Sequence, residues 1–344
     1  MKKTIYIIVL LIVLLLSSCN IGREIELKDR KIDSGNFPDF IFRCYISDNF
    51  DKDGNGVLSV EEIEDVTEIS VKDMEITNLE GVKFFVNLQT LECNNNQLRS
   101  LDVSHNTKLE RLLCGSNEIE CLNLKYNTQL VELDCSLNEL EDLDISHNLK
   151  IRNVRCGFNK ITSLDVSVNA LLEKLACLYN QIESIDVSNN LLLTALLCDD
   201  NNIKNIDVRN NKALTDLRVS NNQLESIDVS NNVLLETFEC KGNKLKEVDV
   251  TNNVLLRGFD CGGNQLTTID ISHNTKLIGF GCEDNAISEL DLSNNPELQL
   301  LNVSNNMLTE LDLSNNTDLR LMWLIGNPLS SLNSSNLDKY GEYP

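Results

Sequence analysis

Apolar residues recur along this 344-residue chain with a period of 21. Each copy has the form L-x-x-L-x-C-x-x-N-x-L-x-x-L-D-V-S-x-N-x-x, and one copy places Leu172, Leu175, Cys177 and Asn180 in its first half. The alternation of Leu175 and Cys177 has a period of two, which predicts a short strand with both side chains turned inward. The later apolar positions follow at spacings of three and two, which predict a loosely coiled return segment. We therefore expect one short unit stacked on copies of itself.

One slot of the repeat holds most of the cysteines. Valine or leucine fills the same slot in three copies, so the slot requires an apolar group, and the thiol serves as a small hydrophobe. Slot side chains run parallel along the stack, so we expect reduced, buried thiols and neither disulfides nor a tetrahedral zinc site. A disulfide between Cys44 and Cys121, which lie outside the slot, stays open. The slot residues are Cys93, Cys114, Cys135, Cys156, Cys177, Cys198, Val219, Cys240, Cys261, Cys282, Val303 and Leu324.

Three polar columns follow the same period. One asparagine column runs from Asn96 to Asn327 and a second from Asn106 to Asn316. A chain that turns every few residues leaves backbone groups unpaired, so we expect these asparagines to donate and accept toward their own coil and the next. An aspartate column runs from Asp102 to Asp312. Stacked carboxylates repel one another, so we expect them to cap turns as solvated groups and not to form a calcium ladder.

The repeat resembles the leucine-rich repeat, in the short variety found in bacterial surface proteins of the internalin type. The resemblance covers residues 66–332, with one 22-residue unit followed by about twelve 21-residue units. The 22-residue unit lacks the cysteine, as a capping repeat does. The resemblance implies an α/β-type repeat solenoid with little helix, in which a right-handed arc carries a parallel sheet on its concave face.

Residues 51–62 form an acidic segment that resembles the EF-hand loop. Calcium prefers six to eight hard oxygen ligands, alternate residues of a tight loop supply them, and Gly56 permits the sharp bend. An acidic turn that binds nothing is the alternative. Because one loop stands alone, we expect a single structural calcium ion that orders a small helical cap over residues 37–65, with affinity in the millimolar class. The predicted ligands are Asp51, Asp53, Asn55, Val57 through its carbonyl group, Ser59 and Glu62.

The first residues are typical of an export signal. A basic start and an apolar run from Ile5 to Leu16 are too short to span a bilayer comfortably and predict a signal peptide over residues 1–18. Leu16, two serines and Cys19 resemble the lipobox of bacterial lipoproteins, which implies cleavage before Cys19 and lipidation of that cysteine. An ordinary signal with a chance cysteine is the alternative. Residues 19–36 are charged and predict a tether, so we expect a lipid-anchored envelope protein, in the outer membrane and exposed at the surface.

Charge limits the partners. The chain has 53 acidic and 30 basic residues and a net charge of −23. Nucleic acid and anionic lipid surfaces repel such a chain, so we expect membrane contact only through the anchor. Divalent cations and basic protein surfaces are compatible ligands.

Catalysis finds no support in the sequence. His105, His147 and His273 all occupy the Ser-x-Asn step of a repeat, and neither a phosphate-binding loop nor a nucleophile motif is present. Function is therefore expected where copies differ on the concave face, at an apolar patch with basic neighbours. The alternative is that some of these side chains fold back onto neighbouring coils. The patch comprises Leu137, Arg155, Phe158, Lys174, Ala176, Leu178, Tyr179, Ala195 and Leu197.

These features favour a non-catalytic protein that binds a macromolecule, above all protein, through the concave face of a monomeric arc. A glycan ligand stays open. The alternative function is a structural envelope protein that mediates self-association or spacing. At the C-terminal end, Leu321, Trp323 and Ile325 are expected to meet a closing segment over Ser330 to Pro344, of which residues 333–344 follow the last repeat.

Overall fold

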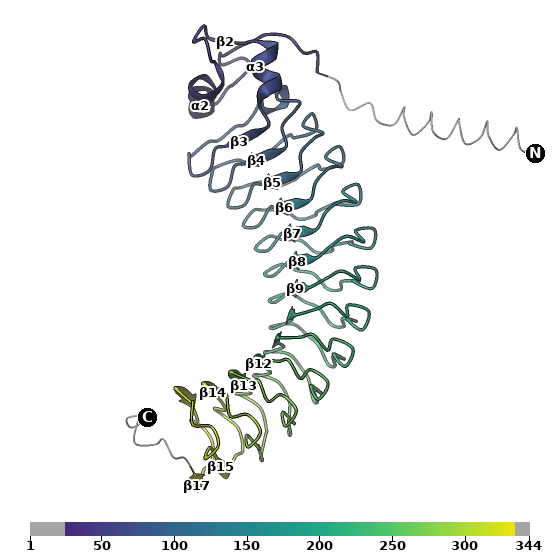
Figure 1. The fold of residues 1–344 in the computed structure, drawn as a ribbon, viewed down its shortest axis with the longest axis vertical. Coiled ribbons are helices and arrows are strands. Elements are labelled where there is room, and N and C mark those ends of the chain that lie inside the picture. Colours follow the sequence, from purple (N-terminus) through teal and green to yellow (C-terminus); the bar gives the residue numbers. More distant parts are fainter. Residues whose placement is uncertain (1–24, 334–344) are drawn as a thin grey trace, which may run out of the picture.

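The computed structural model describes residues 25–333. The expected signal peptide, Cys19 and residues 334–344 lie outside the described residues. The described chain forms an elongated arc with a small cap at its N-terminal end (Figure 1). Within residues 25–333, no helix has the length and apolarity needed to cross a membrane.

A 13-stranded parallel sheet runs the length of the arc, with one strand per coil. Ile69 in its first strand lies opposite Leu91, which is 22 residues later, and Leu91 lies opposite Leu112, 21 residues later. The register then advances by 21 residues at every step, so the predicted period and the longer first unit are confirmed. The strands are β3 (Glu68–Ser70), β4 (Thr90–Glu92), β5 (Arg111–Leu113), β6 (Glu132–Asp134), β7 (Asn153–Arg155), β8 (Lys174–Ala176), β9 (Ala195–Leu197), β10 (Asp216–Arg218), β11 (Thr237–Glu239), β12 (Gly258–Asp260), β13 (Gly279–Gly281), β14 (Leu300–Asn302) and β16 (Leu321–Trp323).

The sheet lies on the concave side of the arc, and the coiled return segments lie on the convex side. Figure 1 shows this at the C-terminal end, where β12 to β14 face the inside of the bend. Strands β15 (Glu310–Asp312) and β17 (Ser331–Asn333) lie on the outer side and pair with each other. The predicted repeat solenoid with a concave parallel sheet and little helix is confirmed.

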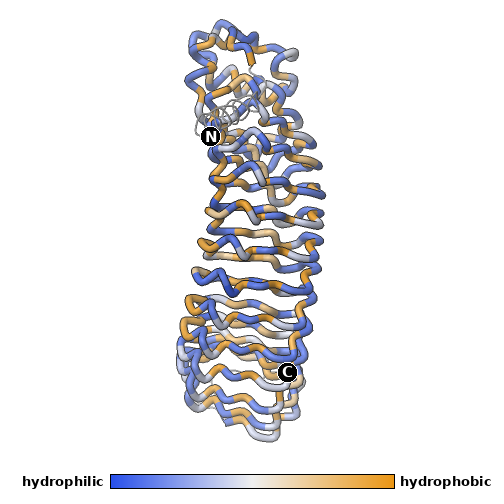
Figure 2. Tube along the Cα trace, turned by 90° about the vertical axis from the view of Figure 1, so that its right-hand side faces the viewer, coloured by the Kyte–Doolittle hydropathy of each residue, from blue (hydrophilic) through white to orange (hydrophobic). Residues whose placement is uncertain are grey.

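The core is one continuous column of apolar side chains. Leu175 and Cys177 are both fully buried, as the alternation in β8 predicts. Figure 2 shows hydrophobic and hydrophilic stretches alternating within each coil. The nine slot cysteines are buried and form no disulfide. Burial raises the pKa of Cys93 and of Cys177 to about 12, so these thiols stay protonated at neutral pH.

The first asparagine column joins adjacent coils. Asn180 Nδ2 donates to the carbonyl oxygens of Cys177 and Cys156, at 3.0 Å each, and its Oδ1 accepts from the Ile161 amide at 2.9 Å. The expectation of donation and acceptance is confirmed, although the neighbour is the preceding coil and not the next one. These side chains satisfy buried backbone groups that the turns would leave unpaired.

The second asparagine column meets only half of its expectation. Asn190 Nδ2 donates to the carbonyl oxygens of Val166 and Asn169, at 3.1 and 2.9 Å. Its Oδ1 is buried and accepts no hydrogen bond from the described residues. The geometry of this turn offers two carbonyl groups to the side chain but no free amide.

The aspartate column caps turns, as expected. Asp186 Oδ1 accepts from the Ser188 amide at 2.9 Å, and the Ser188 hydroxyl and amide lower the pKa of this exposed carboxyl group. The same contact recurs with the residue two places later in other copies, such as Asp165 with Ser167. The hydrogen bonds are local, which is typical of a turn-capping carboxylate.

The cap consists of α2 (Phe40–Phe50), β2 (Val57–Leu58), α3 (Val60–Asp65) and the 3₁₀ turn η1 (Val82–Phe84). Asp39 begins α2 by accepting from the amides of Ile41 and Phe42. The other oxygen of Asp39 accepts from the amide and hydroxyl of Thr77, at 2.9 Å each. One carboxylate thus caps the helix and fastens it to the first coil.

A second short strand of the cap comes from the segment expected to be a tether. Strand β1 (Arg30–Lys31) pairs antiparallel with β2, with Arg30 opposite Leu58. Two residues are too few to show a period-two pattern, so the sequence gave no sign of this strand. Residues 25–29 precede it without regular structure.

The C-terminal coil leaves apolar side chains exposed among the described residues. Leu321, Trp323 and Ile325 are 49, 48 and 62 % exposed. The first residues of the expected closing segment do not cover them, because β17 pairs with β15 on the outer side. Closure by residues 334–344 stays a prediction.

Candidate functional site

Every coil leaves its strand through one residue with positive φ, two places after the cysteine slot. This left-handed conformation suits glycine, asparagine and aspartate, which have no bulky group on Cβ or can hydrogen-bond locally. Most copies obey this preference. The small or polar residues at this rim position are Asn95, Ser116, Asp200, Asn221, Gly242, Gly263, Asp284, Asn305 and Gly326.

Three consecutive copies break the preference. Leu137, Phe158 and Tyr179 hold φ values of 54°, 57° and 53°. A left-handed conformation costs such a residue roughly 1–2 kcal/mol. Their side chains are 50, 43 and 48 % exposed, so the core gains little in return. We call these three residues the strained rim.

The aromatic members of the strained rim are fixed against one another. The rings of Phe158 and Tyr179 stack with centroids 4.4 Å apart and planes at 16°. Tyr179 also forms a side-chain hydrogen bond with Asp200, the rim residue of the next coil, whose charge raises the pKa of the tyrosine. Asn221 Nδ2 in turn donates to Asp200 Oδ1 at 3.0 Å. The rim therefore presents a rigid aromatic platform that continues into a polar row.

Other apolar residues of the predicted patch are less exposed. Leu178 leans over the neighbouring coil, because Gly157 has no side chain there. A Cβ atom on Gly157 would lie 3.1 Å from Leu178 Cδ2. Leu178 and Leu197 are half-buried, as are Ala176 and Ala195. The alternative of folding back thus applies to Leu178 but not to the strained rim.

The two basic residues of the predicted patch differ in their surroundings. Arg155 Nη1 lies 3.4 Å from Glu132 Oε1 and 3.9 Å from Asp134 Oδ2, both on the preceding coil. Lys174 is exposed, and no ion pair joins it to another residue of the described chain. Arg155 and Lys174 belong to the same coils as Phe158 and Tyr179, so one free ammonium group lies on the strand that leads to the aromatic platform.

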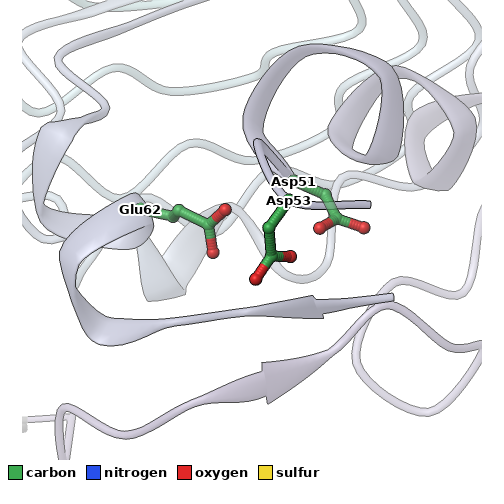
Figure 3. Close-up of side chains that lie close together, drawn as sticks. All are labelled: Asp51, Asp53 and Glu62. Atoms are coloured by element: carbon green, nitrogen blue, oxygen red, sulfur yellow. The ribbon is translucent and has the colours of Figure 1, made fainter. Parts of the chain in front are cut away.

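The acidic loop of the cap brings three of its six predicted ligands together. Asp51, Asp53 and Glu62 each place one carboxylate oxygen within 4.8 Å of the other two. Figure 3 shows the aspartates on the loop after α2 and Glu62 facing them from α3. Gly54 and Gly56 turn the loop with φ values of 70° and 79°.

The remaining predicted ligands take part in hydrogen bonds within the loop. Asn55 Oδ1 accepts from the Val57 amide at 2.7 Å. The Ser59 hydroxyl and amide donate to Glu62 Oε2, and the Lys52 amide donates to Glu62 Oε1 at 2.7 Å. The Ser59 amide is the main reason why the pKa of Glu62 is lowered. Glu62, only 8 % exposed, is thus held as an anion that faces two further carboxylates.

The β1 segment supports the loop from behind. The Ile32 amide donates to the carbonyl oxygen of Gly56 at 2.9 Å, and the Val60 amide donates to Asp29 Oδ1 at 3.1 Å. Both contacts hold the ends of β2 between the loop and α3. Residues 29–32 therefore belong to the cap.

Sequence reasoning missed a carboxylate cluster on the concave face beyond the patch. Glu283 extends over Gly262 and pairs with Lys241, two coils away. A Cβ atom on Gly262 would lie 2.6 Å from Glu283 Cδ, so glycine is required for this contact. Glu283 Oε2 is buried and accepts no hydrogen bond in the described chain. Burial, more than any other effect, raises the pKa of the nearby Asp260.

The three histidines share one environment. The Nδ1 atoms of His105, His147 and His273 lie 3.1 to 3.2 Å from the hydroxyl group of the preceding serine. The repeated Ser-x-Asn step produces this contact in each case. It lies in a turn of the repeat and not beside the strained rim.

The comparisons with solved structures identify the family. InlJ from Listeria monocytogenes, whose functional domain includes a cysteine ladder, matches this chain with 34 % sequence identity and a TM-score of 0.77. The match covers 89 % of this chain and 73 % of InlJ. This chain belongs to the internalin-like leucine-rich-repeat proteins. Its internalin-like repeats carry their own column of nine buried cysteines.

Further structures support the internalin-like fold. The internalin InlF of Listeria monocytogenes matches with a TM-score of 0.81 and 24 % identity, over 90 % of this chain and 98 % of InlF. A leucine-rich-repeat protein of Leptospira interrogans matches with a TM-score of 0.66 and 21 % identity, over 78 % of this chain and 81 % of that one. Neither models of protein families nor curated protein sequences gave a match. Internalin-like arcs of this kind offer an extended concave surface for binding.

Proposed function

We propose that this internalin-like protein is a non-catalytic envelope lipoprotein that binds a protein partner at the strained rim. The observation that carries the proposal is the conformation of Leu137, Phe158 and Tyr179. Each holds a bulky, exposed side chain on a left-handed backbone, at a position where nine other copies hold a small or polar residue. Strain of this kind is kept where the surrounding structure enforces it and a function uses it.

The chemistry of the rim favours a protein over a glycan. Stacked aromatic rings supply a large, preorganised apolar area, and such side chains dominate the binding energy of protein interfaces. The free ammonium group of Lys174 suits an acidic residue at the edge of the partner's contact surface. A glycan bound to the Tyr179 ring is the other outcome that the test must distinguish.

The test compares capture by the native chain and by the variant Phe158→Asn with Tyr179→Asn. Asparagine is the residue that other copies use at this position, so the coil is preserved. Native protein and variant are incubated with envelope and host protein fractions and with an immobilised glycan array. We expect the variant to lose the protein ligand at least tenfold in affinity. Ser116→Asn with Asp284→Asn is the matched control on the same rim, and equal capture by all three proteins contradicts the proposal.

The acidic loop is proposed to hold one calcium ion that stabilises the cap. Support comes from three carboxylates with oxygens within 4.8 Å and from the buried position of Glu62. Carboxylates are hard oxygen donors of the kind that calcium prefers, and a bound ion would relieve the repulsion among them. Asn55, Val57 and Ser59 lie on the same loop and would complete the set.

Calcium titration followed by calorimetry tests this part. We expect saturable binding, a higher melting temperature with calcium and a lower one with chelator. Glu62→Gln removes one charge from the set and should abolish both effects, whereas Glu61→Gln, on the next residue, should not. A melting temperature that is indifferent to chelator in the native chain rules the ion out.

Anchoring at Cys19 is the remaining part of the proposal. It rests on the sequence of residues 1–19, which lie outside the described residues, so it is tested in cells. Cys19→Ser should move the protein from the membrane fraction to the soluble fraction. Protease treatment of intact cells then separates surface display from a position facing the periplasm.

A further inference from the structure

A second exposed feature lies at the opposite edge of the sheet, just before each strand. Each asparagine of the second column begins a tight turn, in which the residue three places later donates its amide to the asparagine carbonyl. Ile151 donates to Asn148, and Leu193 donates to Asn190, each at 3.1 Å. The two central residues of the turn project from the corner of the coil, a place that polar residues usually occupy.

In six consecutive coils these central positions are almost entirely aliphatic. The flanking coils carry Thr128 with Gln129 on one side and Thr275 with Lys276 on the other, so the repeat does not require apolar residues there. Leu149, Leu191 and Leu192 are 56, 59 and 45 % exposed, so the core does not require them either. We call the set the aliphatic ridge. It comprises Leu149, Ala170, Leu171, Leu191, Leu192, Ala213, Val233, Leu234, Val254 and Leu255.

The second asparagine column makes the ridge continuous. Asn169 Nδ2 donates to the carbonyl oxygen of Asn148 at 3.2 Å, and Asn190 donates to that of Asn169 at 2.9 Å. Each turn is therefore stacked directly on the previous one. At a strand spacing of about 4.8 Å, six coils give a row of aliphatic knobs about 24 Å long.

The charges around the ridge are arranged in bands. The turn positions of the ridge contain no carboxylate, although the chain has a net charge of −23. Their only charged residues are Lys150 and Lys212, and no ion pair joins Lys212 to another described residue. Carboxylates border the ridge, with the aspartate column on the return side and Glu173 and Glu236 on the strand side.

We propose that two copies of this chain associate edge to edge through the aliphatic ridge. A row of knobs repeated once per coil fits best against a row of the same pitch, which a second copy supplies. An isologous interface must be self-complementary, and the bands meet this condition because Lys212 of one copy can face the bordering carboxylates of the other. The ridge also lacks aromatic residues and arginine, whereas interfaces between identical subunits are the more apolar ones.

This arrangement leaves the strained rim free. The ridge precedes each strand and the rim follows it, so the two lie at opposite edges of the sheet. A pair of copies would display two rims and gain avidity toward a partner with repeated sites. The inference goes beyond the proposed function and does not depend on it, and it replaces the monomeric arc expected from the sequence.

Sedimentation analysis over a wide concentration range tests the proposal, with the mature chain carrying Cys19→Ser to prevent lipidation. We expect reversible dimers. Leu192→Glu with Leu234→Glu should weaken the dimer at least tenfold without changing the melting temperature, because both residues are exposed. Lys212→Glu should weaken it as well. Thr128→Glu with Thr275→Glu, in the same turn positions outside the ridge, should leave it intact.

Three results would overturn the proposal. One is a native chain that stays monomeric at every concentration. Another is a dimer that persists in the Leu192 and Leu234 double variant. The third is flotation of the native chain with neutral phosphatidylcholine vesicles that this variant abolishes, because the ridge would then be a lipid-binding surface. The Phe158 and Tyr179 double variant should dimerise normally, so failure here and failure of the rim proposal are distinguishable.

Discussion

Phe158 and Tyr179 stack with ring centroids 4.4 Å apart, although each holds a backbone conformation that disfavours its side chain. The stack is worth about 0.5–1.5 kcal/mol beyond simple burial. Two left-handed bulky residues cost together roughly 2–4 kcal/mol. The stack therefore offsets only part of the strain. The isolated chain does not account for these residues, whereas a bound partner that buries the rings would.

Leu137 allows the strain to be measured without the stack. We expect Leu137→Asn to stabilise the protein by about 1 kcal/mol, because asparagine tolerates the left-handed conformation better than leucine does. Urea denaturation measures the change. Asn221→Leu, at the same rim position, should destabilise the protein, since it introduces the strain and removes the hydrogen bond to Asp200. A destabilising Leu137→Asn would mean that leucine makes compensating contacts.

The cysteine slot predicts a difference between two replacements of equal size. Cys177→Val should cost less than about 1.5 kcal/mol, because Val219 and Val303 already fill the slot in other coils. Cys177→Ser should cost about 1–3 kcal/mol, since it buries a hydroxyl group in an apolar column. Thermal and urea denaturation of both variants give the comparison. Equal stability would show that the thiol is not acting as a hydrophobe.

Thiol labelling checks the same column by a separate route. At neutral pH and without denaturant, Cys44 and Cys121 should react, because both are exposed. The nine buried cysteines should react only after unfolding, since the raised pKa values keep them as thiols. Cys44→Ser with Cys121→Ser should abolish the fast phase. A larger fast phase in the native chain would mean that the column opens locally.

The repeat could be predicted from the sequence because the same residue types return to the same slot. Leu175 and Cys177 alternate in every copy, so their burial, the sheet and its register follow from the period. Residues that occur once carry no such signal. The backbone strain at Phe158 became visible only in the structure, because neighbouring copies hide the need for positive φ behind residues as different as asparagine and serine.

Contacts that join distant segments also escaped prediction. Strand β1 is two residues long, and its pairing with β2 joins positions that are far apart in the sequence. The ridge was overlooked for another reason: Leu191 and Leu192 look like core residues in an apolar repeat. Only their exposure shows that they face solvent.

The two asparagine columns should differ in their contribution to stability. Asn180→Ala leaves the Ile161 amide and two carbonyl groups without a partner. Asn190→Ala affects only two carbonyl groups, because its own oxygen accepts nothing in the described chain. At about 1–3 kcal/mol for each buried unpaired group, Asn180→Ala should be the more damaging change by at least about 1 kcal/mol. Urea denaturation decides, and the reverse order would contradict this assignment of the columns.

Two aspartates should respond to pH with opposite signs. The side-chain hydrogen bonds of Arg209 are the main reason why the pKa of Asp207 falls from 3.8 to about 2. A depressed folded pKa contributes stability above pH 3.8, and this stability is lost as the pH falls toward 2. For Asp260 the folded pKa is raised, chiefly by burial and further by the charge of Glu283. Its folded state binds a proton more tightly than the unfolded state, so ionisation at neutral pH costs stability.

Asp260→Asn should therefore raise the melting temperature at pH 7. The asparagine oxygen can still accept from the Gly262 amide, which donates to Asp260 Oδ1 at 2.9 Å, so the turn is kept. The gain should shrink as the pH falls and vanish below the model value of 3.8, where the native carboxyl group is protonated in both the folded and the unfolded state. Asp207→Asn is the control of opposite sign and should lower the melting temperature at pH 7. Melting curves between pH 3 and pH 8 give both profiles, and a constant difference between native chain and Asp260→Asn would show that burial does not disfavour this charge.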